Sequence, residues 1–282
     1  MEMAQTKVIA LAAAVLALCS CEYRYSWQKY RMDGHRTGVV APSANNVDTA
    51  LGTISEDLYT APNGTQYEKG SATYGVAADL IAVQPRMKDL KEVVGYAPRS
   101  MEAAAPESEL SNWWVDLTMR DVARLTRKKV DVGILNFGGI RVSLPQGDLL
   151  LDDFVSMFPF KNDLTYVALK GSDLQAVFET IAATMPFVLG GVKMSVREHH
   201  IDTLLVGGRP IDPDKVYGVA TVDFLLDGGD GLTVAKNAKE LIITDCRVID
   251  SVLEYVRALQ AAGQPFEYHT DGRLTYDEWK EE

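Results

Sequence analysis

Residues 110–141 read LSNWWVDLTMRDVARLTRKKVDVGILNFGGIR and hold a helix pattern, a strand pattern and a glycine turn in direct succession. Apolar residues recur at helical spacing over 110–125, and either Ser108 or Ser111 is available as the N-cap. Over 130–134, valine and isoleucine alternate with aspartate and glycine, which is the period of a strand. The stretch therefore predicts a helix, a strand and a tight turn that follows it.

The pattern continues toward the C-terminus. Alternation predicts strands over 165–169, 192–196, 201–206 and 216–222, and helical spacing predicts helices over 152–157, 174–185 and 249–262. Asp152 or Asp153 can cap the first of these helices, and Ser172 the second. Because neighbouring strands form hairpins instead of alternating with helices, the sequence predicts an α+β fold, a mixed β-sheet flanked by helices.

Length, charge and histidine content limit the number of domains and the classes of function that the protein can have. The chain has 282 residues, which allows one large domain or two small ones. Its 39 acidic and 28 basic side chains leave a net charge of −11, which argues against binding to a nucleic acid polymer. Its four histidines are few for a metal-dependent hydrolase.

The N-terminus is typical of an exported protein. An apolar run over 8–19 follows Lys7 and is too short for a ~30 Å bilayer core, so it predicts a signal peptide. It ends in Leu18-Cys19-Ser20-Cys21, which resembles the bacterial lipobox with Cys21 as the acylated residue. We therefore expect a lipoprotein signal peptide over 1–20 and a lipid-anchored protein on the periplasmic or cell-surface side of the bacterial envelope. The alternative is a cleaved secretory signal without a lipid.

Two further segments follow the signal. Residues 21–87 are rich in turn formers and predict a tether and an extended arm, whereas 88–282 carry the regular patterns of a domain. Cys246 would be the one unlipidated thiol of the mature protein, and its apolar surroundings predict a buried, inert side chain.

Familiar catalytic strings are missing from the sequence. It contains no GxxxxGK[ST], no GxGxxG after a strand, no GxSxG and no HExxH. Asp33-Gly34-His35 imitates the start of a dimetal phosphatase site, but no Asn-His-Glu or His-x-His string accompanies it. We therefore predict no catalytic residue and no metal ligand.

Three loops carry residues suited to binding. Asn136 offers a donor and an acceptor, and Arg141 offers a planar fork for carboxylate or phosphate. Phe160 follows a stiff proline, and Phe224 precedes a tight turn that carries Asp230. Singly, each loop also fits a plain turn, a core phenylalanine or a capping aspartate. Together, two aromatic rings, amides and a carboxylate suit a flat ring with polar edges, such as a purine.

Six strings in order carry a family resemblance. They are ESELSN at 107–112, NFGGIR at 136–141, PFKN at 159–162, LKGS at 169–172, GVK at 191–193 and the loop 224–231. The region from about Leu90 to Trp279 resembles the C-terminal domain of the 5'-nucleotidase family, the periplasmic and surface enzymes that include UDP-sugar hydrolases. The resemblance implies an α+β fold and a pocket for the base and ribose of a nucleotide.

The resemblance also implies seven binding residues. The implied roles are base stacking by Phe160 and Phe224, bonds to the base edge from Asn162 and Gly191, bonds to the ribose hydroxyls from Asp230, and contacts on the ribose-phosphate side from Asn136 and Arg141.

The sequence departs from the family at several points. Full-length relatives carry an N-terminal metallophosphatase domain with two metal ions, whereas about 65 residues separate the expected anchor from the matched region here. Pro106 replaces an arginine that often precedes Glu107, and Ser111 and Lys161 replace glycines. These changes leave recognition of the phosphate open.

The expected function is that of the substrate-specificity domain of a split 5'-nucleotidase, which binds a nucleoside or nucleotide. It would act in nucleotide catabolism with a separate metallophosphatase subunit that holds the divalent metals. The chain itself would need no cofactor, would be inactive alone and would meet the membrane through its lipid only. The alternatives are a stand-alone nucleoside- or nucleotide-binding lipoprotein and a structural surface protein on the same fold.

Overall fold

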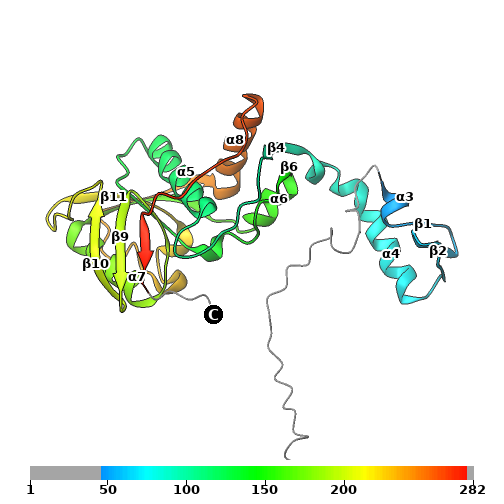
Figure 1. The fold of residues 1–282 in the computed structure, drawn as a ribbon, viewed down its shortest axis with the longest axis horizontal. Helices are drawn as coiled ribbons and strands as arrows, with labels where there is room; N and C mark the ends of the chain where they lie inside the picture. The colour runs from blue at the N-terminus through cyan, green and yellow to red at the C-terminus, as the bar shows by residue number, and fades with distance from the viewer. Residues whose placement is uncertain (1–45, 278–282) are drawn as a thin grey trace, which may run out of the picture. The chain divides into compact units, whose positions relative to one another are not determined.

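The computed structural model describes residues 46–277, apart from the side chain of Arg86. The predicted signal peptide, Cys21 and the Asp33–His35 string lie outside these residues. Internal contacts divide the chain into two compact units, one ending at Ala77 and the other running on from Ala78. Figure 1 shows the elements of both.

The first unit is small and contains short regular elements. They are helix α3 (Val47–Ala50), strands β1 (Thr53–Ile54), β2 (Leu58–Thr60) and β3 (Gln66–Glu68), and the first part of helix α4 (Ala72–Val83). The strands form one antiparallel sheet, on which Tyr59 and Tyr67 stack with their ring centroids 5.9 Å apart. The sequence pattern is irregular here because strands of two or three residues are too short to show a period.

The second unit is built on a five-stranded sheet in the order β12-β7-β11-β5-β8. Its strands are β5 (Val132–Leu135), β7 (Asp163–Lys170), β8 (Val188–Gly190), β11 (Val216–Val222) and β12 (Glu240–Arg247). Strands β11 and β5 are parallel, and the other neighbouring pairs are antiparallel. The sheet is therefore mixed, and the α+β prediction is confirmed.

Helices contact this sheet. They are α5 (Glu109–Thr126), α7 (Gly171–Thr184) and α8 (Val248–Ala261), and the short helix α6 (Leu151–Met157) packs against α8. Residues 164–169 of β7 are all buried, which requires cover on both faces of the strand, and both α5 and α7 contact it. Helix α8 packs against α5 and β12 (Figure 1).

Smaller elements complete the unit. They are β4 (Val93–Ala97) paired with β6 (Gly147–Leu150), a sheet of β10 (His200–Val206), β9 (Val192–Arg197) and β13 (Leu274–Tyr276), and the 3-10 turns η1 (Gln84–Met87), η2 (Asp89–Lys91), η3 (Phe137–Gly139), η4 (Asp223–Leu225) and η5 (Gly229–Gly231). Among residues 46–277, no helix is long and apolar enough to span a bilayer.

The helix caps decide between the predicted alternatives. Ser108 caps α5, and Ser111 returns a bond to the Ser108 backbone N–H, so the two serines form a reciprocal capping box. For α6, neither Asp152 nor Asp153 is the N-cap, because the helix begins at Leu151 after Leu150; Asp153 lies in its first turn and accepts from the Leu150 N–H at 2.7 Å. The cap predicted at Ser172 is wrong, because α7 begins one residue earlier, at Gly171.

Three other expectations from the sequence differ from the structure. Met185 follows the end of α7 and is 42 % exposed, so it lies outside the apolar face assigned to it. Residues 240–247 form strand β12 at the edge of the sheet, where no strand was predicted. Cys246 on this strand is only half-buried, and burial raises the pKa of its thiol.

Candidate functional site

A cavity of about 200 Å³ lies at the ends of the central strands of the five-stranded sheet. Strands β5 and β11 are parallel and end there, and β7 begins there because it is antiparallel to β11. Each strand end leads into or out of one of the three loops singled out in the sequence. The lining residues are Asn136, Gly138, Gly139, Arg141, Phe160, Asn162, Phe224 and Asp230. Six of the seven predicted binding residues therefore meet in one pocket.

Two phenylalanine rings form the apolar part of this pocket. Phe160 and Phe224 are each 45 % exposed, although most large apolar side chains of the unit are buried. Aromatic rings that stay in water within a concave site are available to stack on a flat ligand. Phe224 is held in place through its backbone N–H, which donates to the Asp223 carboxylate at 2.8 Å.

The polar part of the pocket centres on a bond between two loops. Asn136 follows β5, Asp230 follows β11, and the Asn136 Nδ2 donates to the Asp230 Oδ2 at 2.6 Å. Asp230 sits in a left-handed conformation with φ of 47°. The turn that carries it is closed by the Gly228 N–H, which donates to the Leu232 carbonyl at 2.6 Å. The carboxylate is thereby presented at the pocket.

Helix α5 supports the glycine turn beneath the pocket. A Cβ atom on Gly139 would lie 2.3 Å from the Cη2 atom of Trp114, a side chain that is almost fully buried. Only glycine lets the turn rest on the indole ring this closely. Gly138 and Gly139 line the pocket although no binding role was predicted for them; their adjacency in the NFGGIR string is the signal that could have pointed to them.

Arg141 places a positive charge at the pocket. Its Nη1 donates to the Gly138 carbonyl at 3.2 Å, and its Cζ lies 5.8 Å from the centroid of the Phe160 ring. Within residues 46–277, no carboxylate lies within ion-pair distance of this guanidinium. An exposed arginine without an acidic partner, in a protein of net charge −11, can take an anionic group of a ligand.

Gly191 is the one predicted binding residue that lies away from the pocket. Strand β8 is antiparallel to β5, and Val188 pairs with Leu135 beside the pocket, whereas Gly191 follows the other end of β8. A Cβ on Gly191 would lie 2.2 Å from the carbonyl oxygen of Asp131, which precedes β5. At ~3.3 Å per residue, the length of β5 separates Gly191 from the pocket by roughly 13 Å. Gly191 is therefore not part of the lining of this pocket, and its predicted bond to the base edge stays a prediction.

The ESELSN string holds two segments together. The Glu107 Oε1 accepts from the Asn112 Nδ2 at 2.6 Å and from the backbone N–H groups of Asp271 and Gly272 at 2.8 and 3.2 Å. This string therefore ties the start of α5 to the chain near its C-terminus. Neither this string nor Lys161 contributes to the lining of the pocket.

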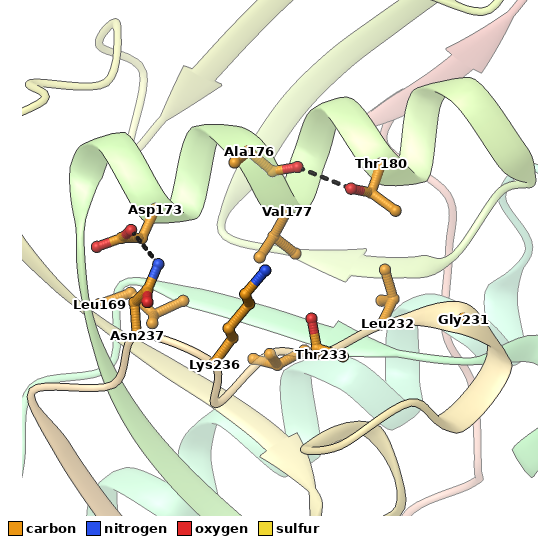
Figure 2. Close-up of a pocket in the computed structure, with 11 residues that line it drawn as sticks. Leu169, Asp173, Ala176, Val177, Thr180, Gly231, Leu232, Thr233, Lys236 and Asn237 are labelled. Atoms are coloured by element: carbon orange, nitrogen blue, oxygen red, sulfur yellow. Dashed lines mark hydrogen bonds between the residues drawn. The ribbon is translucent and has the colours of Figure 1, made fainter.

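A second cavity, of about 210 Å³, lies between α7 and residues 231–237 (Figure 2). Lys236 extends toward α7 in this view, and the Asn237 Nδ2 donates to the Asp173 carboxylate at 2.7 Å. Gly231 and Leu232 belong to its lining. The turn 228–232 therefore carries Asp230 into the first cavity and forms a wall of the second.

Metal-ligating side chains do not cluster in the part of the chain that the structure describes. Between residues 46 and 277, no group of three or more His, Cys, Asp and Glu side chains is placed to hold a metal ion. The first pocket itself contains one carboxylate and no histidine.

Comparisons with known proteins agree with this geometry. Residues 89–237 match the family model described as 5'-nucleotidase, C-terminal domain. Protein UshA of Yersinia enterocolitica is 27 % identical over 164 residues, which are 55 % of this chain and 29 % of that protein. The 5'-nucleotidase of Vibrio cholerae is 29 % identical over 116 residues, which are 39 % of this chain and 21 % of that protein.

A solved structure shows the same fold. The 5'-nucleotidase precursor of Thermus thermophilus superposes with a TM-score of 0.63 at 24 % identity, over 73 % of this chain and 44 % of that one. The chain spans less than a third of the length of the curated relatives it matches.

Proposed function

Because this chain belongs to the 5'-nucleotidase C-terminal domain family, we propose that its pocket binds the base and ribose of a nucleoside or nucleotide. The observation that carries the proposal is the pair of half-exposed rings, Phe160 and Phe224, in one cavity with Asn136, Asp230 and Arg141. Stacking would hold the base, and the polar groups would orient the sugar.

Three polar side chains of the pocket have a proposed partner on the ligand. Asn162 can bond the edge of the base, since its amide offers both donors and an acceptor. The Asp230 carboxylate can accept from ribose hydroxyls, and Arg141 can donate to a 5'-phosphate with its planar fork. A nucleoside monophosphate would therefore use Asn162, Asp230 and Arg141, whereas a nucleoside would leave Arg141 without an anion.

We further propose that this chain is the substrate-specificity part of a split 5'-nucleotidase. Two-metal hydrolysis needs several carboxylate and imidazole ligands around ions ~3.5–4 Å apart, and the pocket contains one carboxylate. A separate metallophosphatase would supply the divalent metals, and the pair would act in nucleotide catabolism. Acylation at Cys21 would hold this chain on the periplasmic or cell-surface side of a bacterial envelope.

The binding proposal is tested by calorimetric titration of the purified chain with adenosine, guanosine, uridine and AMP. Replacing Phe160 or Phe224 with alanine should weaken binding, because a base stacked on an aromatic ring gains ~1–3 kcal/mol. Leu241→Ala is the matched control, since Leu241 is an equally exposed apolar residue on β12. Unchanged affinity in both phenylalanine variants, or no heat with any nucleoside, would contradict the proposal.

The split-enzyme proposal is tested by phosphate release from AMP with excess Mg²⁺, Mn²⁺ or Zn²⁺. We expect no sustained turnover by this chain alone and restored turnover when the metallophosphatase encoded nearest to its gene is added. Metal-dependent turnover by the purified chain would overturn it.

A stand-alone nucleoside or nucleotide receptor is the second candidate. The lining residues of this chain include two aromatic rings, two side-chain amides, a guanidinium and a carboxylate, which are the groups that a nucleoside or nucleotide would need. Tight nucleoside binding by the chain, with no change in turnover on adding any metallophosphatase, would favour this receptor.

A further inference from the structure

We propose that Asn136 is a positioning residue, which holds the Asp230 carboxylate toward the sugar and thereby makes the pocket select ligands with a 2',3'-diol. The inference rests on the proposed function, because it assigns a role within the same pocket. It differs from the direct ribose-phosphate contact that the family resemblance implies for Asn136, because the amide donor points elsewhere in this structure.

The side-chain N–H of Asn136 donates to the Asp230 carboxylate. An ionised carboxylate can only accept hydrogen bonds, so the amide must face it with Nδ2, and the distance to Oδ2 is 2.6 Å. Bonds of an N–H group to a carboxylate are short and about twice as strong as neutral ones. The Asn136 side chain is 8 % exposed and is seated against the glycine turn, with its Oδ1 3.2 Å from the position of a Cβ on Gly139. Its amide is therefore fixed before any ligand arrives.

Asp230 depends on this bond for its orientation. Within the part of the chain that the structure describes, the Asn136 amide is the group that hydrogen-bonds the Asp230 side chain. The backbone of the turn is anchored by the buried Leu232, whereas Asp230 itself is exposed beside the first cavity, and Gly231 and Leu232 line the second cavity (Figure 2). Glycines at 228 and 231 have φ of 99° and 81° and flank Asp230 on a turn of unusual backbone conformation. Without Asn136, the carboxylate could rotate into water.

The fixed carboxylate has enough free lone pairs to accept hydrogen bonds from both hydroxyls of a diol. With Oδ2 bonded to Asn136, Oδ1 and the remaining lone pair of Oδ2 can accept two hydroxyl hydrogens. A site built to bond a substrate hydroxyl rejects an analogue that lacks it, because its polar groups are then left unpaired. Adenosine offers both hydroxyls, and 2',3'-dideoxyadenosine offers the same base without them. The ratio of their affinities therefore reports on the Asn136–Asp230 pair separately from stacking.

The experiment is a double-mutant cycle read by calorimetry with these two ligands. Asn136→Ala should lose about tenfold in affinity for adenosine and less than about twofold for 2',3'-dideoxyadenosine, since one bond to a charged group is removed. Asp230→Ala should remove the preference for the diol. Adding Asn136→Ala to Asp230→Ala should then change nothing, because Asn136 acts through Asp230. Asn162→Ala is the control and should weaken both ligands equally.

The outcomes of this cycle separate the inference from the proposed function. If Asn136→Ala weakens both ligands equally, or costs as much in the Asp230→Ala background, Asn136 is a direct contact or a structural residue and the inference is overturned. In that case, binding by the unaltered chain still supports the proposed function. If the unaltered chain binds neither adenosine, guanosine nor uridine, the proposed function fails and this inference fails with it.

An isosteric variant covers the case in which Asn136→Ala does not fold. Asn136→Asp places two carboxylates in contact, which repel one another unless they share a proton. We expect its preference for adenosine over the dideoxy analogue to be lost at pH 8, because the donor that holds Asp230 has been removed. A preference that stays at the wild-type value at pH 8 would also overturn the inference.

Discussion

Gly139 shows how the absence of one side chain shapes the pocket. The turn after β5 packs against the indole ring of Trp114, a residue of α5. Any side chain at position 139 would point into that ring. The same contact also places Asn136 beside the turn, so a change at Gly139 should affect both the stability of the domain and the binding of its ligand.

We predict that Gly139→Ala lowers the free energy of unfolding by about 1–3 kcal/mol, the usual cost of overpacking a buried contact. It should also weaken nucleoside binding, because the turn must move off Trp114. Denaturant unfolding and titration with adenosine measure the two effects. Gly75→Ala serves as the control, since a Cβ at this helical glycine meets nothing within 4 Å and should not destabilise the protein. A Gly139→Ala variant as stable as the unaltered chain would contradict the prediction.

At the scale of elements, a buried acid joins the two long helices that pack together. Asp121 on α5 is fully buried, and the Ser251 hydroxyl on α8 donates to its Oδ2 at 2.5 Å. The guanidinium groups of Arg120 and Arg124 lie at 2.9 and 3.3 Å from its Oδ1. Burial alone would raise the pKa of this carboxyl, but bonds from Arg120 and Ser251 lower it below its usual range. The acid is therefore charged and paired at neutral pH.

This pairing predicts a pH-dependent stability. Because the folded pKa of Asp121 is below that of the unfolded chain, its contribution is fully present above the unfolded value of ~3.9 and is lost as the pH falls through the folded pKa. We expect Asp121→Asn to lower the free energy of unfolding at pH 7 by about 1.5–3 kcal/mol, the range for bonds to charged groups.

Thermal unfolding between pH 3 and pH 7 measures this effect. The loss of stability toward acid should be shallower in Asp121→Asn than in the unaltered chain. Asp152→Asn is the control, since Asp152 is a half-buried acid paired with Lys91 at 3.2 Å away from this helix pair. Parallel stability curves for the unaltered chain and Asp121→Asn would refute the assignment.

At the scale of the whole molecule, the pocket and the expected anchor lie in different parts of the chain. The pocket is formed within the second unit, by residues 136–230, whereas the expected acylation site, Cys21, precedes both sets of described elements in sequence. Binding and anchoring should therefore be separable by mutation.

We predict that Cys21→Ser moves the protein, expressed in a Gram-negative host, from the detergent phase to the aqueous phase in Triton X-114 partition. The thioether-linked lipid at Cys21 would hold the unaltered protein in the detergent phase. The Cys21→Ser protein would have no acylated residue. Cys19→Ser should stay in the detergent phase. Nucleoside affinity of the Cys21→Ser protein should equal that of the unaltered chain. An unaltered chain found in the aqueous phase would favour the unlipidated secretory alternative.

Local patterns in the sequence determined the helices α5 to α8, the strands β5, β7, β9, β10 and β11, and most of the pocket, but not the strands β4, β6, β8, β12 and β13. Strand β11 has the bounds that alternation predicts, and α5 and α8 begin and end within one or two residues of their predicted limits. These elements are predictable because burial on one face imposes a period that neighbouring residues carry. The loop residues were recognised because glycine, proline and aromatic residues stand together at strand ends.

The tertiary structure alone decided which of those residues meet. Asn136 and Asp230 are 94 positions apart and bond only because β5 and β11 lie side by side in parallel. Gly191 lies outside the pocket lining because β8 runs antiparallel to β5, and no local pattern records that direction. Periodicity is a property of neighbours along the chain, whereas a binding site is a property of neighbours in space.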